Sequence, residues 1–491
     1  MASSILQIPE MMALDSRRNL IRIPPELDVP LTTRMRRLID TAAFRRLHRI
    51  SQLGLVSLVY PAAQHSRFEH SLGVYRLALH VLRHLAHQPE FTAQVDTRAA
   101  TRFMLAALLH DIGHWPFAHI IEDLQLPGVP HHEAVAEHHL RSPEVAQILR
   151  NDFDTTPEDV ATLLCHHGHD PQEYQTSLLY SILSGPIDVD KMDYLMRDSL
   201  HAGVPYGRNY DQPRLLASLC LNATHDGLAL SEKGRTAAEM LVFARYVMFS
   251  EVYWNHAVRA ATAMFQRSIY RLSQTMPIAK LVVKSDQEAI IRLRHEARGT
   301  SSARLLSGLF GKRRRLYKRV SQYSAFEQNE LYFQLARRSY TWTESFCTRF
   351  AELASSALGE TIPTDAILLD VPPCRRETEV RIDLFYPKEQ KYRRLEDVSP
   401  IIQTFVRSQP IPPLNPNSRL ITTSPPTLIP QNATETKTIR CITESAHAYR
   451  FDDYVKRVRL FADPLYVPRL RRLPQLADLV WQAASECDRG M

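Results

Sequence analysis

Several features that mark other protein classes are missing from this chain of 491 residues. Its six cysteines are scattered and form no CxxC pair, which argues against a zinc ribbon or a disulfide framework and is typical of a reducing compartment. No apolar run approaches the length of a membrane span. The first residues lack the basic start and the long apolar core of a signal peptide. We therefore expect a cytoplasmic protein without a membrane partner.

Known nucleotide-binding signatures are missing as well, because the chain contains neither a Walker loop nor a dinucleotide fingerprint. What is present is the composition of an ordinary globular protein, with 44% hydrophobic and 23% charged residues. The length suits either two to four domains or one large helical core with an appendage. The net charge of +7 mildly favours anionic partners such as nucleotides or nucleic acid.

The stretch from Phe103 to His114, FMLAALLHDIGH, carries the strongest signal in the chain. Its first seven residues are apolar, so we expect a helix without a polar face that lies inside the protein. The stretch nevertheless ends in His110, Asp111 and His114. A buried imidazole beside a carboxylate costs free energy unless a metal, a proton or a partner group binds them. Taken alone, the pair His110–Asp111 is more typical of a hydrogen bond at a helix end.

A second helix is predicted to begin at Ser66, which forms the capping-box sequence S-x-x-E with Glu69. Apolar residues follow with helical spacing as far as Leu85. Arg67 and His70 lie in the first turns, where a cationic side chain is poorly placed for the helix dipole. An anionic ligand would explain why Arg67 stands there.

A third helical segment, PIDVDKMDYLMRD at residues 186–198, carries acidic, basic and aromatic side chains. On a helix, Asp190, Lys191, Tyr194 and Asp198 share one face. Such a face suits a metal-bound polyanionic substrate with a ring or a sugar. A surface helix with ion pairs four residues apart gives the same pattern.

Together these segments supply two imidazoles and two carboxylates, from His70, His110, Asp111 and Asp190. These four side chains are a sufficient ligand set for a divalent ion and leave room for water and substrate oxygens. Each motif is a weak signal by itself. Their combination in three helical segments predicts a metal site.

The pattern of the chain changes after about residue 280. We divide it into an N-terminal extension at 1–30, a helical catalytic core at 31–280 and a C-terminal lobe at 281–491. Within the lobe, a proline-rich loop or linker is expected at 409–430.

Strands are expected in the lobe at residues 366–371, 380–385 and 455–461. In the core, residues 55–65 have the pattern of a short strand that runs into a loop.

These motifs resemble the HD-domain deoxynucleoside triphosphate triphosphohydrolases, a family that includes bacterial dGTPases and vertebrate enzymes that join a sterile alpha motif to an HD domain. The resemblance covers residues from about 20 to 465, and SRFEHSLGV and IDVDK are its most specific matches. It runs through LIDTAAFRRLHRISQLG, YPAAQHSRFEHSLGV, LLHDIGHWPFAH, His132-Glu133 and IDVDKMDYLMRD.

The resemblance implies a mainly α fold, with an HD-domain helical core and a smaller mixed α/β C-terminal lobe of regulatory or assembly function. It also implies a divalent metal cofactor (Mg, Mn, Fe, Co or Zn) and cleavage of a dNTP into deoxynucleoside and inorganic triphosphate. The implied metal ligands are His70, His110, Asp111 and Asp190.

The resemblance also implies roles for the residues around the metal. The triphosphate and the sugar would be held by Arg67, Lys191 and Tyr194. The 3′-hydroxyl and the deoxyribose would be contacted by Gln52 and Leu53, and sugar or base by Asp198 and Tyr253. The phosphates would be lined by His114 and His119, with His132 as general acid or base and Glu133 beside it.

The chain departs from the family at three positions. Glu122 stands where the vertebrate enzymes have Asp, and Arg45 and His48 stand where the family has Gln and Arg beside an allosteric nucleotide contact at Asp40. The family resemblance and the arginine-rich stretch from Arg34 to Arg49 nevertheless predict a homo-oligomer, a tetramer or hexamer, with a possible nucleotide activator.

Two other functions remain open. One is an HD phosphohydrolase that acts on nucleoside monophosphates, cyclic dinucleotides or guanosine polyphosphates, although Gln52, Leu53 and Arg67 argue against it. The other is a nucleic-acid-binding HD protein that uses the basic segment Lys312–Arg319, which has six basic residues in eight. A charge run of this kind is more often a solvated face.

Overall fold

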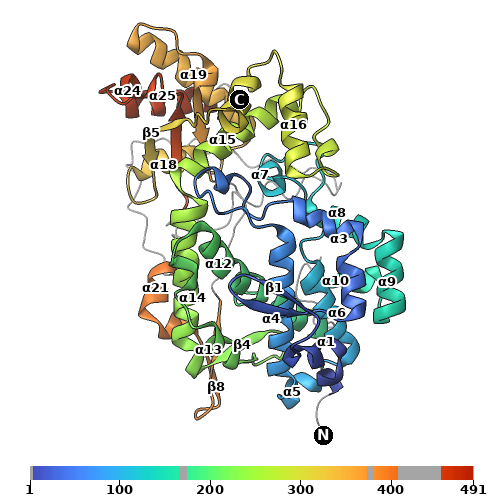
Figure 1. Ribbon diagram of the computed structural model, residues 1–491. Coiled ribbons are helices and arrows are strands. Elements are labelled where there is room, and N and C mark those ends of the chain that lie inside the picture. The colour runs from blue at the N-terminus through green and yellow to red at the C-terminus, as the bar shows by residue number, and fades with distance from the viewer. Residues whose placement is uncertain (1–3, 165–173, 373–380, 407–454, 490–491) are drawn as a thin grey trace, which may run out of the picture. The chain divides into compact units, whose positions relative to one another are not determined.

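The computed structural model describes residues 4–164, 174–372, 381–406 and 455–489 (Figure 1). The chain forms two compact units, the first of residues 1–317 and 379–399 and the second of residues 318–378 and 400–491. The mainly α fold with a smaller mixed α/β C-terminal lobe, which the resemblance implies, is confirmed. The proline-rich segment expected at 409–430 lies outside the described residues.

This division differs from the boundary expected near residue 280. The first unit continues past that point because α17 (Ser302–Phe310) packs against α15 (His256–Leu272) through a buried apolar face. The N-terminal segment also belongs to the first unit. Residues 381–399 also belong to the first unit, because β7 (Asp383–Tyr386) pairs with β4 (Leu228–Ser231).

Three helices form the centre of the first unit, namely α4 (Arg67–Leu85), α6 (Thr97–Leu109) and α12 (Val189–Ala202). Helix α4 packs against both α6 and α12. The other helices of eight or more residues in this unit are α8 (His132–Leu140), α9 (Pro143–Phe153), α10 (Pro157–Leu164), α11 (Tyr174–Ser184), α14 (Arg235–Met248), α15, α16 (Asp286–Glu296) and α17.

The three central helices begin where their sequences supply a cap. Ser66 accepts the backbone N–H of Glu69 at the start of α4, Asp96 accepts that of Ala99 in α6, and Asp188 accepts that of Lys191 in α12. Every residue of α6 from Phe103 to Leu109 is fully buried, as its apolar sequence predicts. His110 and Asp111 thus follow directly on a fully buried helical segment.

Two small sheets complete the first unit. One is the hairpin of β1 (Leu20–Ile23) and β2 (Leu27–Pro30). The other has the order β3-β4-β7-β8, where β3 (Leu219–Leu221) and β8 (Lys391–Arg394) form the edges and β4–β7 is the parallel pair. The second strand expected from the sequence, at 380–385, is therefore displaced to 383–386.

The second unit contains an antiparallel sheet of order β5-β9-β6, formed by Lys318–Tyr323, Val458–Ala462 and Ile367–Asp370. Its helices include α18 (Asn329–Leu335), α19 (Tyr340–Leu358) and α25 (Leu476–Arg489), and α19 packs against both β6 and α25. The strands expected at 366–371 and 455–461 correspond to β6 and β9.

The strand expected at residues 55–65 is wrong, because the structure has a 3-10 helix there, Gly54–Leu58. Gly54 has φ +50°, which turns the chain away from an extended path. Beside this turn, Ser51 and Ser66 form an isolated antiparallel β-bridge.

Among the described residues, no helix is both long and apolar enough to cross a membrane.

Candidate metal centre and active site

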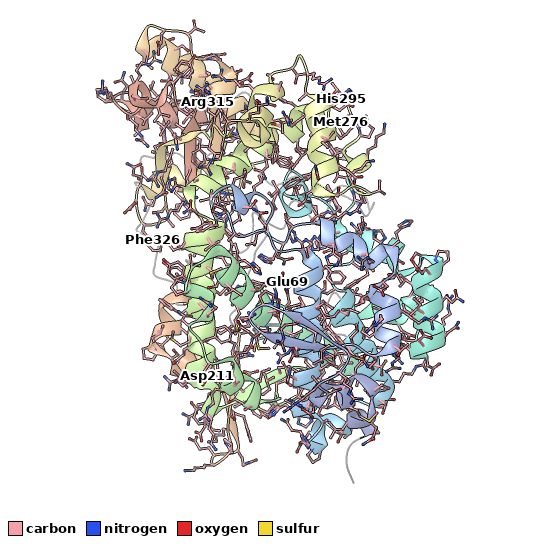
Figure 2. All side chains as sticks on the ribbon, viewed as in Figure 1. Glu69, Asp211, Met276, His295, Arg315 and Phe326 are labelled. Atoms are coloured by element: carbon pink, nitrogen blue, oxygen red, sulfur yellow. The ribbon has the colours of Figure 1, made fainter. Side chains whose placement is uncertain are left out.

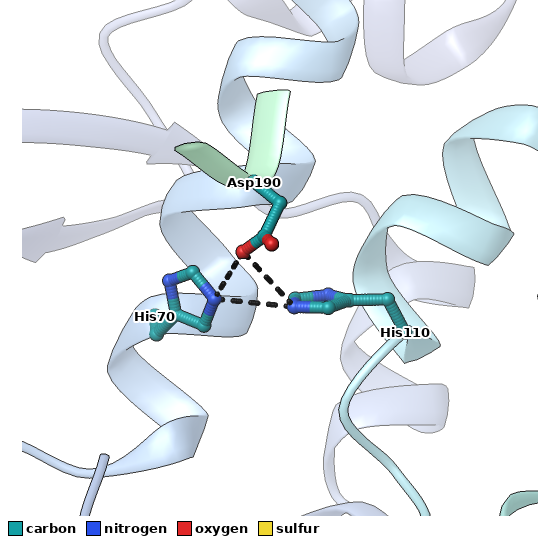
Figure 3. A group of neighbouring side chains, drawn as sticks. All are labelled: His70, His110 and Asp190. Atoms are coloured by element: carbon teal, nitrogen blue, oxygen red, sulfur yellow. Dashed lines mark hydrogen bonds and ion pairs between the residues drawn. The ribbon is translucent and has the colours of Figure 1, made fainter. Parts of the chain in front are cut away.

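Three of the predicted metal ligands converge at the junction of α4, α6 and α12 (Figure 3). The Nε2 atoms of His70 and His110 lie 3.1 Å apart. Oδ1 of Asp190 lies 3.0 Å from the first nitrogen and 3.8 Å from the second. The three ligand atoms are close enough together to bind one ion.

The far side of each imidazole is already engaged. Nδ1 of His70 lies 2.8 Å from the carboxylate of Asp193, and Nδ1 of His110 lies 2.9 Å from the carbonyl oxygen of Ala107. Both partners only accept hydrogen bonds, so each Nδ1 carries a hydrogen and each ring directs its Nε2 at the centre. This is the usual arrangement for histidines that bind metal.

The donor set fits a divalent metal. Two lone pairs and a carboxylate that point at one another repel unless a positive charge lies between them. The negative charge around His70 shows in its pKa: burial lowers the pKa, but the hydrogen bonds to Asp190 and Asp193 outweigh burial and raise it to about 10. Nitrogen and oxygen donors of this kind suit Mn, Fe, Co and Zn.

The fourth predicted ligand, Asp111, lies beside this cluster. Its Oδ1 is 3.5 Å from Nε2 of His110 and 3.2 Å from Nε2 of His114, and its Oδ2 accepts a hydrogen bond of 2.7 Å from Arg67. Burial raises the pKa of Asp111, but the guanidinium of Arg67 together with His110 and His114 outweighs burial and holds the pKa well below its usual range. The carboxylate is therefore ionised, as a metal ligand has to be.

A histidine–carboxylate pair lies on the next elements of the chain. Nδ1 of His132, the first residue of α8, is 3.0 Å from Oε2 of Glu122, and the backbone N–H of His132 donates to Oε1 of the same carboxylate. Burial raises the pKa of Glu122, but the hydrogen bonds and charge of His132, together with His119, outweigh burial and lower it. Glu122 thus orients the ring of His132 through Nδ1, and Nε2 remains for a substrate.

Two more predicted histidines surround His132. The ring of His114 stacks on it with 4.1 Å between centroids, and the ring of His119 meets it edge-on at 5.1 Å. Burial and then the charge of Arg67 lower the pKa of His114 well below its usual value, so that ring is neutral. Glu133 lies further out, with Oε1 3.7 Å from Nε2 of His132.

Gly113 makes the approach of α8 possible. A Cβ at this position would lie 2.0 Å from the carbonyl oxygen of His132 and 2.4 Å from the backbone nitrogen of Ala136. Arg46 holds the same loop from the other side by donating to the carbonyl oxygens of Ile112 and His114.

Of the two cations expected to hold phosphates, only Arg67 is directed at the site. Its Nη1 meets Asp111, whereas its buried Nε has no hydrogen-bond partner among the described residues. The ammonium of Lys191 instead donates to the carboxylate of Asp188 and to the carbonyl oxygen of Gly185. Lys191 would have to leave these partners to reach a phosphate.

The residues expected near sugar and base form a second group. Asp198 is buried and accepts from the hydroxyl of Tyr253 at 2.6 Å, and its other oxygen lies 2.8 Å from Nε2 of His65. The rings of Tyr194 and Tyr253 lie 6.5 Å apart. Asp198 thus fixes the position of Tyr253, a tyrosine that is remote in sequence.

The segment with Gln52 and Leu53 is anchored by its neighbours. The backbone N–H of Gln52 donates to the carbonyl oxygen of His65, and Asp286 accepts from both the N–H and the hydroxyl of Ser51. Oε1 of Gln52 is buried without a hydrogen-bond partner in the described part of the chain. A ligand hydroxyl would satisfy it.

Several residues that support the site were not identified from the sequence. Asp193 holds His70, and Arg197 holds Asp193 through two hydrogen bonds of 2.8 Å. The carboxylate of Glu69 (labelled in Figure 2) accepts from Arg197 and faces Nε2 of His201 at 2.9 Å. The expected second half of the capping box at Ser66 is therefore not formed. The spacing of Asp193 and Arg197, four residues apart in one helix, was the available signal.

Comparison with known proteins gives two matching family models, the HD domain at residues 67–201 and the HD associated region at residues 210–410. The chain is 30% identical over 397 residues to the uncharacterized protein MJ1154 of Methanocaldococcus jannaschii. This match covers 79% of this chain and 76% of that protein. It is 35% identical over 213 residues to the deoxynucleoside triphosphate triphosphohydrolase SAMHD1 of Mus musculus. This match covers 38% of this chain and 32% of the mouse protein.

The chain is also 34% identical over 238 residues to the uncharacterized protein YwfO of Bacillus subtilis, and this match spans 48% of this chain and 52% of that protein. Among solved structures, a hypothetical protein of Aquifex aeolicus has a similar fold, with a TM-score of 0.62 at 23% identity over 92% of this chain and 98% of that one.

Proposed function

Because this chain belongs to the family of HD-domain proteins that carry an HD associated region, we propose that it is a metal-dependent phosphohydrolase whose substrates are deoxynucleoside triphosphates. It releases deoxynucleoside and inorganic triphosphate. The observation that carries this proposal is the convergence of His70, His110 and Asp190 next to the His132–Glu122 pair. The partial similarity to the mouse triphosphohydrolase supports the choice of substrate.

A divalent ion held by these ligands would supply Lewis-acid chemistry at the α-phosphate and a water activated near neutral pH. The chain itself provides rigid orientation of the ligands. Asp193 and the carbonyl oxygen of Ala107 fix the two imidazoles, and Arg67 fixes the carboxylate of Asp111. Because the ligands are held before an ion binds, little free energy is spent on ordering them.

We assign the proton transfer to His132. Its Nδ1 faces the carboxylate of Glu122, and its Nε2 is the atom from which a proton can be donated. From Nε2 that proton passes to the departing 5′-oxygen as the bond to the α-phosphorus breaks. General acid catalysis of this kind contributes roughly a hundred- to ten-thousand-fold to the rate.

The triphosphate needs positive charge and hydrogen-bond donors. Arg67 provides a fixed guanidinium at the start of α4, with its Nε still available. His119 can donate to phosphate oxygens, whereas the N–H of the neutral His114 is directed at Asp111, so His114 lines the phosphates without donating to them. Lys191 joins them only after it leaves Asp188.

Selection of the sugar is assigned to the group around Asp198. The carboxylate fixes Tyr253, and Tyr194 lies beside that ring. The unpartnered Oε1 of Gln52 would accept the 3′-hydroxyl of the deoxyribose, and Leu53 would contact the sugar ring.

The test is an assay of all four dNTPs with Mg, Mn, Fe and Co, in which the phosphorus products are separated. Inorganic triphosphate together with the deoxynucleoside is the expected result. Inorganic phosphate as the product, or hydrolysis of nucleoside monophosphates, cyclic dinucleotides or guanosine polyphosphates in place of dNTPs, would overturn the proposed substrate. Nucleic-acid affinity that falls steeply with salt and survives loss of His110 would support a role for the segment Lys312–Arg319.

A further inference from the structure

A second group of potential metal ligands lies outside the predicted metal centre. It consists of His119, Glu122 and His132, whose ligand atoms lie within 4.8 Å of one another. Nδ1 of His132 is 3.0 Å and Nδ1 of His119 is 3.9 Å from Oε2 of Glu122. The group shares no residue with His70, His110 and Asp190. We propose that it binds a second ion of the zinc class, which inhibits the enzyme.

The distances are close to those that zinc requires. Ligand atoms at about 2.0–2.1 Å from a tetrahedral ion are about 3.4 Å apart. The separations of 3.0 and 3.9 Å lie on either side of that value. The side chain of His119 is 56% exposed, so its ring can turn by the small amount that is needed and is accessible to ions from solvent.

Glu122 is held in place for this role. Its Oε1 accepts the backbone N–H of His132, which fixes the carboxylate independently of the imidazole proton. Oε2 is then directed at both rings. Two imidazoles and one carboxylate form a common zinc set, with a further position for water.

The types of ligand atom determine which metal ion binds. Imidazole nitrogen binds zinc, copper, nickel and cobalt well, whereas magnesium and calcium prefer oxygen ligands. We therefore expect Zn²⁺ to bind at this second site and Mg²⁺ not to bind there.

Inhibition follows if His132 is the proton donor, and this step alone depends on the proposed function. An ion on Nδ1 takes the position of the Nδ1 hydrogen, which is released or moves to Nε2. The ring then cannot become the imidazolium that carries hydrogen on both nitrogens. Proton donation from Nε2 to the leaving group is lost while the ion stays bound.

The binding test uses Zn²⁺ alone on the full chain freed of metal, without nucleotide. Bound zinc is counted after dialysis for the wild type and for His119→Gln, Glu122→Gln and His110→Ala, with His138→Gln as the matched control because His138 is an exposed histidine of α8 outside the cluster. His119→Gln and Glu122→Gln are each expected to bind one zinc fewer than the wild type, and His138→Gln the same number. A His119→Gln/His110→Ala double variant is expected to lose two.

Circular dichroism confirms that each variant is folded. Full retention of the wild-type zinc count in both His119→Gln and Glu122→Gln would overturn the second site, whatever the enzyme hydrolyses. In the activity arm, zinc is added to the Mn²⁺-loaded enzyme. The zinc concentration that halves each protein's own rate is expected to rise about tenfold or more in His119→Gln. An unchanged midpoint would overturn the inhibitory role.

Discussion

Nδ1 of His70 lies 2.8 Å from Oδ2 of Asp193, and this contact determines which nitrogen of the imidazole faces the metal centre. Asp193 is held in turn by Arg197, whose buried guanidinium also donates to Glu69. Burial raises the pKa of Asp193, but Arg197 outweighs burial and brings the pKa well below its usual value. The linked ion pairs of Asp193, Arg197 and Glu69 behind His70 therefore direct Nε2 of His70 at the metal centre.

We predict that Asp193→Asn weakens metal binding by about ten- to a hundredfold, which is the usual cost of losing a partner behind a metal-binding histidine. Zinc or manganese titration of the metal-free protein measures the change. Asp15→Asn is the control, since Asp15 is 85% exposed and pairs only with the surface residue Arg83. Equal affinity in Asp193→Asn and in the wild type would show that His70 needs no such support.

Gly73 provides a second test of the same packing. A Cβ there would lie 1.9 Å from Oδ1 of Asp193 and 2.4 Å from Nη2 of Arg197. Helix propensity alone predicts that Gly73→Ala stabilises the protein by roughly 0.5–1 kcal/mol, whereas overpacking is expected to destabilise it by about 1–3 kcal/mol. The sign of the change in unfolding free energy, measured by denaturant titration, separates the two effects. Stabilisation would contradict the close approach of α12 to α4.

The sequence predicts the helices of the site well, because their signals are local. The apolar run from Phe103 to Leu109 and the cap at Ser66 lie at the elements that the structure contains. The strand expected at residues 55–65 fails because Gly54 turns the chain at positive φ, and periodicity does not report a single backbone angle.

The supporting contacts of the site could not be predicted in the same way, because they join residues remote in sequence. Asp193 meets His70 across 123 positions, and Tyr253 meets Asp198 across 55. The family resemblance marks Glu122 only as a departure from the family pattern. Its role becomes clear once α8 brings His132 within hydrogen-bond distance, which Gly113 permits.

Loss of the proton donor and loss of the metal ligands are expected to differ in their effects. His132→Ala should reduce single-turnover hydrolysis by roughly a hundred- to ten-thousand-fold and keep the metal of the first site. His110→Ala with Asp111→Ala should lose both hydrolysis and that metal while the helical signal stays largely intact. Metal content measured beside the rate distinguishes the two. Normal turnover in the double variant would contradict the metal centre.

The His132–Glu122 pair also predicts a dependence of stability on pH. The folded-state pKa of Glu122 is lowered, so its contribution is present above the unfolded value of about 4.3 and is lost as pH falls through the folded pKa. The difference in melting temperature between the wild type and Glu122→Gln should therefore be largest near neutral pH and should decrease below about pH 4. A difference that grows as the solution becomes more acidic would contradict this assignment.

The surface around Asp40 leads to a prediction about oligomeric assembly. We propose a tetramer or hexamer whose formation or activity responds to a nucleotide. Arg45 lies 3.4 Å from Asp40, and both side chains are more than half exposed. His48 stacks on Phe68 with 3.6 Å between ring centroids, and burial followed by the charge of Arg45 lowers its pKa. His48 is therefore neutral and engaged in packing, which leaves Arg45 as the cation beside Asp40.

A triphosphate bound at Arg45 would offset the repulsion between basic faces of neighbouring subunits, so that binding and association would be linked. Light scattering with each NTP and dNTP, beside the activity assay, measures this linkage. Arg45→Ala should require higher nucleotide concentrations for assembly, whereas Arg22→Ala, which removes another exposed arginine paired with an aspartate, should not. A monomer at micromolar concentration that is fully active on a single dNTP without a lag would show that the nucleotide-linked assembly does not exist, and would leave the metal centre and its chemistry unaffected.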